Sequence, residues 1–134
     1  LYQPRDGADH FDFMPACAAL NYPVISAEPP YTHQQSANML LGPAPSAENI
    51  ERRSPARHVS NYTPPTFLVH ALDDEPVPFQ NSLILLEAMR QARRPVEIHL
   101  FEEGGHGFGI CPSNAPAGQW TLLFEAFSKR HYGA

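Results

Sequence analysis

The hydrophobic positions of the chain fall into short continuous runs that predict β-strands. Thr66–Ala71 combines β-branched, aliphatic and aromatic residues without a polar face, so we predict that it is central in a sheet. Met14–Ile25 is apolar on both faces of a pleat and predicts a second buried parallel strand. Val96–Phe101 alternates between two faces, which indicates a half-exposed strand nearer an edge.

Two later segments have helical features. Pro78–Arg94 begins with proline, which suits a first helical turn, and ends with arginines, which favour the negative carboxyl end of a helix. Gly118–Tyr132 repeats large apolar residues at helical spacing and presents one broad face to a sheet. The apolar positions are Leu83, Leu86 and Met89 in the first segment, and Trp120, Leu123, Phe124 and Phe127 in the second.

The segment Ser26–Thr63 is rich in proline, asparagine and serine and has few regularly spaced apolar residues. It predicts a surface excursion with two short helices, Tyr31–Leu41 and Ser46–Arg53, the second capped by Ser46. The resulting order of strand, excursion, strand, helix, strand and helix is typical of parallel strands joined by crossovers. We therefore predict an α/β fold, and 134 residues correspond to one domain at most, spanning residues 1–134.

Charge and hydropathy exclude several classes of partner. The 9 Lys and Arg residues are outnumbered by 14 Asp and Glu residues, and a net charge of −5 does not favour binding to nucleic acid. Apolar runs such as Met14–Leu20 are far shorter than the ~20 residues that span a bilayer, so no membrane segment is predicted. Cys17 and Cys111 form no CxxC pair and are expected to be free thiols.

Two loops at the predicted carboxyl ends of strands carry reactive side chains. His70–Pro78 places Asp73 and Asp74 just after the central strand, and Glu102–Gly109 surrounds His106 with glycines after the last strand. Because the carboxyl ends of parallel strands meet at one edge of a sheet, we expect an acid and His106 to pair there. In such a pair the carboxylate orients the imidazole and stabilises the imidazolium that forms during catalysis.

The segments PPTFLVHALDDEPVP and VEIHLFEEGGHGFG, followed by a tryptophan-bearing helix, closely resemble the C-terminal half of an α/β-hydrolase. The resemblance is to the acetyl esterase and acetylxylan-esterase-like group, which is related to dienelactone hydrolases and prolyl-oligopeptidase-type peptidases. It extends over essentially the whole chain and is most specific from Pro64 to Gly109.

The family patterns assign roles to individual residues. H-G-x-x-D-x-x-V-P falls on His70–Pro78, with alanine at Ala71 where glycine is common. The resemblance implies that Asp74 is the acid of a catalytic triad, with Asp73 as the alternative. The pattern G-G-H-G-F implies that His106 is the general base.

The resemblance implies a serine hydrolase that cleaves a carboxylic ester, an acetylated carbohydrate or another small ester, without a metal or organic cofactor. The family's nucleophile lies on a G-x-S-x-G turn before the acid, and no serine of this chain has glycine at both flanking positions. We therefore expect a fragment that is inactive alone and that self-associates through the unpaired edge of Met14–Ile25. A prolyl-oligopeptidase-type peptidase and a noncatalytic binding module are the alternatives.

Other polar residues have simpler interpretations. His70 ends a buried strand and is expected to be a core histidine, whereas His99 is expected to be exposed. The acids Glu102 and Glu103 are expected to be solvated. The groups closest to a metal-binding set lack any recognised ligand spacing: they are His70, Asp73, Asp74, His99 and His106. Three residues that follow the first strand are candidates for lining a substrate pocket: Tyr31, His33 and Met39.

Overall fold

The computed structural model describes residues 3, 5–10, 14–110 and 115–132. Its centre is a parallel sheet of three strands in the order β1 (Ala18–Asn21), β2 (Thr66–Ala71) and β3 (Val96–Phe101). The first residue of β2 pairs with the first residue of each neighbour, so the three strands end close to one another. The predicted α/β fold is confirmed.

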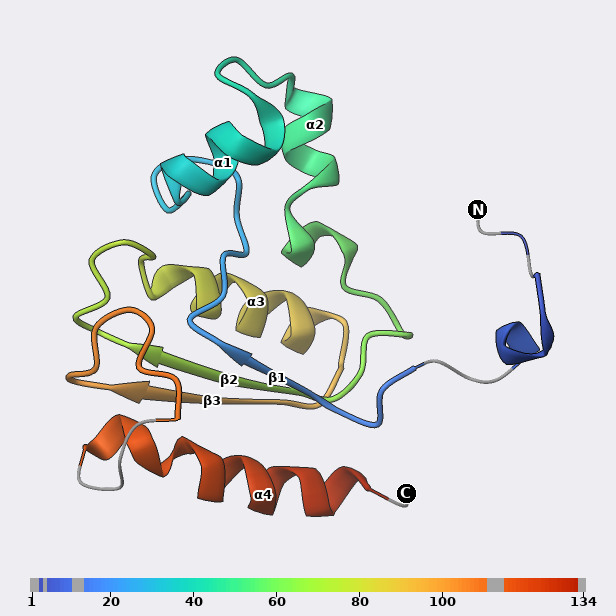
Figure 1. The fold of residues 1–134 in the computed structure, drawn as a ribbon, viewed down its shortest axis with the longest axis vertical. Helices are drawn as coiled ribbons and strands as arrows, with labels where there is room; N and C mark the ends of the chain where they lie inside the picture. The colour runs from blue at the N-terminus through green and yellow to red at the C-terminus, as the bar shows by residue number, and fades with distance from the viewer. Residues whose placement is uncertain (1–2, 4, 11–13, 111–114, 133–134) are drawn as a thin grey trace.

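Helices cover both faces of the sheet, and Figure 1 shows α3 (Gln80–Gln91) on one side and α4 (Trp120–His131) on the other. The strand β2 is buried along its whole length, and its side chains alternate between the two layers. Phe67 and Val69 belong to the core on the α4 side, whereas Leu68 packs with Leu85 and Met89 of α3. This alternation determines which helix each polar residue near the end of β2 meets.

The helix α4 packs against the sheet as its apolar spacing predicts. Phe127 is buried, and Trp120, Leu123 and Phe124 pack on the same cluster. A short 3₁₀-helix, η3 (Pro116–Gln119), leads into it, and two others are η1 (Gly7–His10) and η2 (Pro55–His58). Among the described residues, no helix is long and apolar enough to cross a membrane.

Two expectations from the sequence need correction. The strand predicted over Met14–Ile25 is limited to β1 and is half-buried, because in the described residues β1 has a neighbour on one side only. The residues that α3 buries also differ from those predicted. Leu83 is exposed, and the polar residues Asn81 and Ser82 are fully buried instead, because both have hydrogen-bond partners inside the fold.

The predicted excursion forms α1 (Gln34–Leu41) and α2 (Ala47–Arg52), which lie beyond α3 on its side of the sheet (Figure 1). The Ser46 hydroxyl accepts a hydrogen bond from the backbone N–H of Asn49, which confirms the predicted helix cap. No residue of either helix is buried. The excursion therefore adds little to the core.

Two buried polar side chains hold the base of this excursion: Asn81 of α3 binds its beginning, and Ser54, near its end, also binds its beginning. Asn81 accepts hydrogen bonds from the backbone N–H groups of residues 25–26, at 2.9 Å each, and donates one to the carbonyl of Tyr31 at 2.8 Å. At the other end, the hydroxyl of Ser54 accepts a hydrogen bond from the N–H of Ala27 at 3.2 Å. We call this pair of attachments, through Asn81 and Ser54, the neck of the excursion.

Candidate active site

The loops that follow β2 and β3 bring Asp74 and His106 together at the carboxyl edge of the sheet. Nδ1 of His106 lies 2.9 Å from Oδ2 of Asp74. The Asp74 side chain is fully buried, whereas 38% of the His106 side chain is exposed. Because a carboxylate only accepts hydrogen bonds, Nδ1 carries the proton, and Nε2 is the ring atom that remains able to take up a proton.

Within the described residues, Nε2 of His106 has no hydrogen-bond partner, which is the state expected of a base that waits for its proton donor. The other oxygen of the acid is held by the backbone: the N–H of Val77 donates to Oδ1 of Asp74 at 2.9 Å. One oxygen of the carboxylate is thus held by the loop that precedes α3, and the other is bonded to the imidazole of His106.

A second histidine, His70, lies next to Asp74 on the core side. His70 is fully buried, with Nδ1 at 2.8 Å from the hydroxyl of Ser82 and Nε2 at 2.9 Å from the carbonyl of Val77. The same Nε2 lies 3.2 Å from Oδ2 of Asp74. His70 is a core histidine with satisfied ring nitrogens, as expected, but its contact with the acid was not predicted.

The loop that carries His106 depends on glycine conformations. Gly105 and Gly107, on either side of His106, have φ angles of +60° and +84°, in the left-handed region that favours glycine. The N–H of Gly105 donates to Oδ1 of Asp73 at 2.8 Å, and this hydrogen bond, against a smaller effect of desolvation, holds the pKa of Asp73 below its ordinary value. Asp73, the alternative acid, therefore ties the two loops together, and the ring of His106 is bonded to Asp74 instead.

The aromatic ring of Tyr22 forms one wall of the pair. Tyr22 directly follows β1 with a φ of +41°, an unusual angle for a residue with a side chain. Its ring meets the imidazole of His106 edge-on, at 4.8 Å between centroids, and the ring of Phe108 at 4.9 Å. No sequence signal pointed to Tyr22, which lies inside the apolar run Met14–Ile25.

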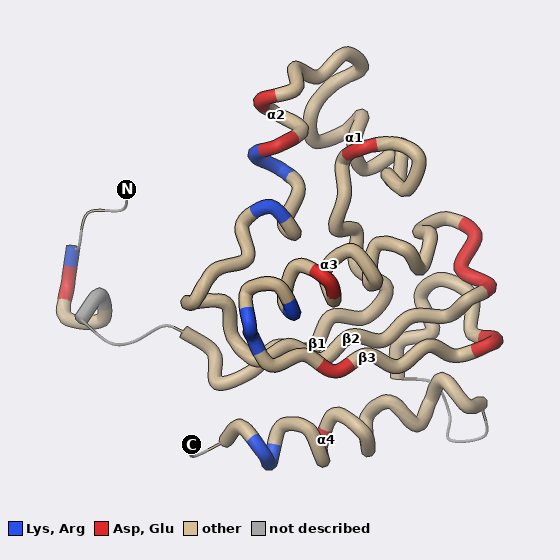
Figure 2. Tube along the Cα trace, turned by 180° about the vertical axis from the view of Figure 1, so that it is seen from behind, with Lys and Arg blue, Asp and Glu red and all other residues tan. Residues whose placement is uncertain are grey.

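Charge is unevenly distributed around this edge. Figure 2 shows acidic residues gathered on the loops after β2 and β3, and basic residues at the opposite end of the sheet, where α3 ends. The exposed acids near the pair are Asp73, Glu75, Glu102 and Glu103, which agrees with the solvated positions expected for the last two. The surface around Asp74 and His106 is therefore negatively charged.

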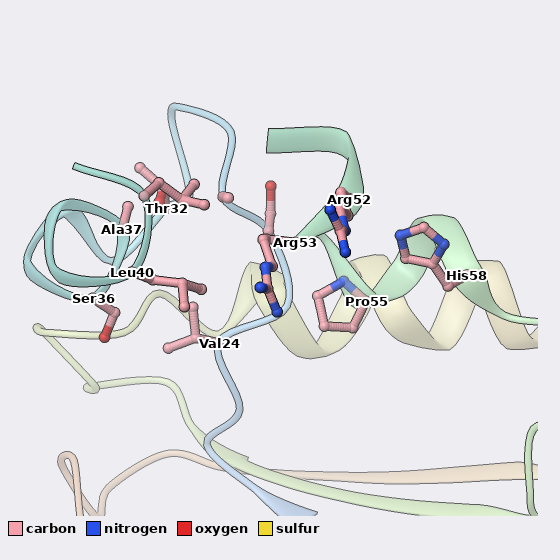
Figure 3. Close-up of a pocket in the computed structure, with 12 residues that line it drawn as sticks. Val24, Thr32, Ser36, Ala37, Leu40, Arg52, Arg53, Pro55 and His58 are labelled. Carbon is pink, nitrogen blue, oxygen red and sulfur yellow. The ribbon is translucent and has the colours of Figure 1, made fainter. Parts of the chain in front are cut away.

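A separate hollow of about 410 Å³ lies between α1 and α2, and Figure 3 shows its lining. The walls include Leu40 from α1, Arg52 from α2 and Arg53, which follows α2. Neither Asp74 nor His106 lines it. The three residues proposed for a substrate pocket do not line it either, although Thr32 and Ser36 of the same segment do: they are Tyr31, His33 and Met39.

His99 is half-buried, not exposed as expected, because its ring packs on Phe67 at 5.1 Å and bonds to Glu97 at 2.8 Å. Burial opposes the ionisation of Glu97, but hydrogen bonds from His99 and Arg130 outweigh it and lower the pKa of Glu97. The described residues contain no group of three or more side chains that could hold a metal ion. Cys17 is a free thiol, and Cys111 lies outside the described residues.

Comparisons with known proteins identify the family of the chain. A model of the prolyl oligopeptidase family matches residues 13–134. An acetylxylan esterase from Xylanibacter ruminicola is 32% identical over 104 residues, which are 75% of this chain and 22% of the esterase. The endo-1,4-beta-xylanase B of Butyrivibrio fibrisolvens is 35% identical over 92 residues, which are 69% of this chain and 14% of that protein.

A solved structure gives the same result for the fold. The acetyl ester-xyloside bifunctional hydrolase from Caldicellulosiruptor lactoaceticus superposes with a TM-score of 0.82 at 38% identity, over 87% of this chain and 42% of that one. The chain therefore spans less than half the length of each of these three relatives. It belongs to the prolyl oligopeptidase family and has the fold of the C-terminal part of an α/β-hydrolase.

Proposed function

We propose that this chain supplies the general base and the acid of a serine ester hydrolase, with His106 as the base, Asp74 as the acid and a nucleophile carried outside the chain. The observation that carries the proposal is the 2.9 Å contact between Nδ1 of His106 and a fully buried carboxylate oxygen of Asp74. This contact leaves Nε2 protonless and turned away from the acid, which is the state that a base needs in order to activate a hydroxyl.

The proposed reaction uses these two residues throughout. Nε2 of His106 takes the proton of a serine hydroxyl while the serine oxygen attacks the ester carbonyl. Asp74 remains ionised and stabilises the imidazolium, and His106 then gives the proton to the leaving alcohol. In the second half of the reaction His106 activates water, which releases the acid and regenerates the serine.

The charge around the site supports a neutral substrate. The acids on the two loops repel an anionic acyl group or an anionic sugar, whereas an acetyl ester on an uncharged carbohydrate carries no charge to repel. The names of the acetylxylan esterase and the acetyl ester-xyloside hydrolase point to the same class of substrate. We therefore propose acetylated carbohydrate or a similarly small neutral ester.

A peptidase is the second candidate, because the matching family model is that of prolyl oligopeptidases. The two activities differ in the leaving group, which is an alcohol in an ester and an amine in a peptide. Comparing one acyl group on both kinds of leaving group separates them.

The experiment uses a chimera in which this chain replaces the matching part of the Caldicellulosiruptor hydrolase, so that the remaining part supplies the nucleophile. We expect hydrolysis of 4-nitrophenyl acetate and acetylated xylose, and a loss of at least about 10³-fold in the His106→Ala variant. The matched control is His99→Gln, which changes a histidine away from the pair and is expected to leave turnover unchanged.

Two outcomes would contradict the proposal. Equal turnover in the His106→Ala chimera would remove the role of His106 and favour a noncatalytic scaffold. Faster hydrolysis of 4-nitroacetanilide than of 4-nitrophenyl acetate would favour the peptidase. The unmodified chain, incubated with a fluorophosphonate probe, is expected to form no adduct, and an adduct that depends on His106 would place a nucleophile within this chain.

The outer edge of β1 supports the idea that the chain works with a further strand. Within the described residues this edge has no neighbour, and Oδ1 of Asn21 at its end is buried without a hydrogen-bond partner. We expect the chain alone to self-associate in sedimentation experiments. A monomer at all concentrations would contradict this.

A further inference from the structure

We propose that His70 is a positioning residue, whose Nε2–H group holds the carbonyl of Val77 and, through that residue, the carboxylate that His106 uses. The inference rests on the proposed roles of Asp74 and His106 and adds a third side chain to them. It comes from the contacts of His70, which extend from the core side of the sheet to the acid.

The proton positions follow from the neighbours of the ring. Nε2 of His70 faces the carbonyl oxygen of Val77 at 2.9 Å and Oδ2 of Asp74 at 3.2 Å, and both of these oxygens only accept. Nε2 therefore carries a proton and donates it to the carbonyl of Val77, whereas its approach to Oδ2 of Asp74 is an electrostatic contact. Nδ1 is then the accepting atom of a neutral ring, and the hydroxyl of Ser82 donates to it at 2.8 Å.

Val77 closes the arrangement into a ring of contacts. Its N–H donates to Oδ1 of Asp74 at 2.9 Å, and its carbonyl accepts from His70, which in turn reaches Oδ2 of the same carboxylate. Oδ1 of Asp74 is thus held by Val77, whose own position depends on His70. The carboxyl plane cannot rotate without breaking one of these contacts.

Burial makes these contacts costly to lose. His70 and Ser82 are fully buried, and so is the side chain of Asp74. Water cannot replace a missing partner there, so an unpaired group would destabilise the fold. The orientation of the Asp74 carboxylate therefore depends on β2, which carries His70, and on α3, which carries Ser82.

The effect reaches His106 through Oδ2, which His106 and His70 share. With the carboxylate fixed, Nδ1 of His106 meets an oxygen at one defined position, and the imidazole is held as the Nδ1–H tautomer. Without the donor from His70, the carbonyl of Val77 loses its partner, the carboxylate is held less firmly, and the second tautomer of His106 becomes populated.

The first test is a long-range ¹H–¹⁵N NMR spectrum of the labelled chain, which reports the tautomer of each histidine. We expect His70 to carry its proton on Nε2 and to accept at Nδ1. A proton on Nδ1 alone would overturn the proposal without any substitution.

The second test compares two variants at the same position. His70→Gln keeps an N–H donor close to the place of Nε2, whereas His70→Leu removes both polar atoms. We expect His106 to remain the Nδ1–H tautomer in the glutamine variant and to become a mixture of tautomers in the leucine variant. An unchanged His106 tautomer in a folded His70→Leu variant would overturn the proposal.

Two further measurements keep the result decisive. If His70→Leu does not fold, Ser82→Ala removes the donor to Nδ1 of His70, and an unchanged His106 tautomer in a Ser82→Ala variant whose His70 tautomer has shifted would overturn the proposal. In the chimera, we expect His70→Leu to lower kcat about 10- to 100-fold with KM unchanged, and His70→Gln to restore most of it. A chimera that is inactive while the chain shows the expected tautomers would refute the proposed function and leave the positioning of Asp74 standing.

Discussion

The packing around Gly104, in the loop before His106, leads to a prediction that can be tested by a double-mutant cycle. A Cβ atom added at Gly104 would lie 3.1 Å from Cβ of Ala71, 3.2 Å from Cδ1 of Phe108 and 3.3 Å from Cβ of Ala117. All three distances are closer than ordinary carbon contacts, and two of the neighbours are rigid methyl groups. The φ angle of Gly104 is not in the left-handed region, so the cost is one of packing alone.

We expect Gly104→Ala to lower the free energy of unfolding by about 2 kcal/mol, within the usual range for overpacking a core. Ala71 stands where the resembling family pattern commonly has glycine, so Ala71→Gly removes the closest of the three contacts. In the double variant we expect a favourable coupling energy of about 1 kcal/mol. The summed costs of the two single variants would then exceed the cost of the double variant.

The assay is urea unfolding followed by the fluorescence of Trp120, the only tryptophan of the chain. Two other glycines serve as controls with nothing within 4 Å of an added Cβ. Gly7→Ala is expected to change stability by less than about 0.5 kcal/mol. Gly105→Ala is expected to cost about 1–2 kcal/mol through its φ of +60° and to show no coupling to Ala71→Gly.

The reasoning would be refuted if Gly104→Ala were as stable as the unmodified chain. It would also be refuted if the costs of Gly104→Ala and Ala71→Gly added without coupling, because the contact between the two methyl groups would then be absent.

Three further predictions concern stability. Phe127→Ala is expected to cost about 3–5 kcal/mol in urea unfolding, because Phe127 is buried against aromatic rings of the sheet and of α4, and a cost below about 1 kcal/mol would contradict this packing. Ser46→Ala removes the cap of α2 and is expected to cost about 1 kcal/mol, whereas Ser46→Gly should cost only a few tenths. Glu97→Gln is expected to cost about 0.5 kcal/mol at neutral pH, since the side chain is partly exposed. Because the pKa of Glu97 is lowered in the fold, this contribution is present above its ordinary value of 4.5 and is lost as the pH falls through the lowered value. If the free energies of unfolding of Glu97→Gln and of the unmodified chain still differed in acid, the ion pair between Glu97 and Arg130 would be contradicted.

Local patterns predicted the elements whose structure depends on their own residues. The bounds of β2 and β3 agree with the runs Thr66–Ala71 and Val96–Phe101, because each run is ended by a proline or a turn. The meeting of Asp74 and His106 was also predictable, since parallel strands end at one edge. Its catalytic interpretation depended on the resemblance of the two loops to a family.

Features that depend on distant partners were not predictable in this way. The strand β1 is shorter than the apolar run Met14–Ile25, because pairing with β2 determines its length. Asn81 and Ser82 occupy the buried face of α3, where a leucine was expected, because their partners lie in segments far away in the sequence. For the same reason, the contact of His70 with the acid has no counterpart in a sequence pattern.

The neck formed by Asn81 and Ser54 has a consequence for the evolution and engineering of the fold. Between these attachments, α1 and α2 contribute no buried residue, so the length and composition of the excursion can change at little cost to the sheet. An ion pair also joins the two ends of the excursion: Nη2 of Arg57 donates to both carboxylate oxygens of Glu28, at 2.9 and 3.1 Å. We therefore expect that α1 and α2 can be shortened or exchanged while the acid and the base keep their places.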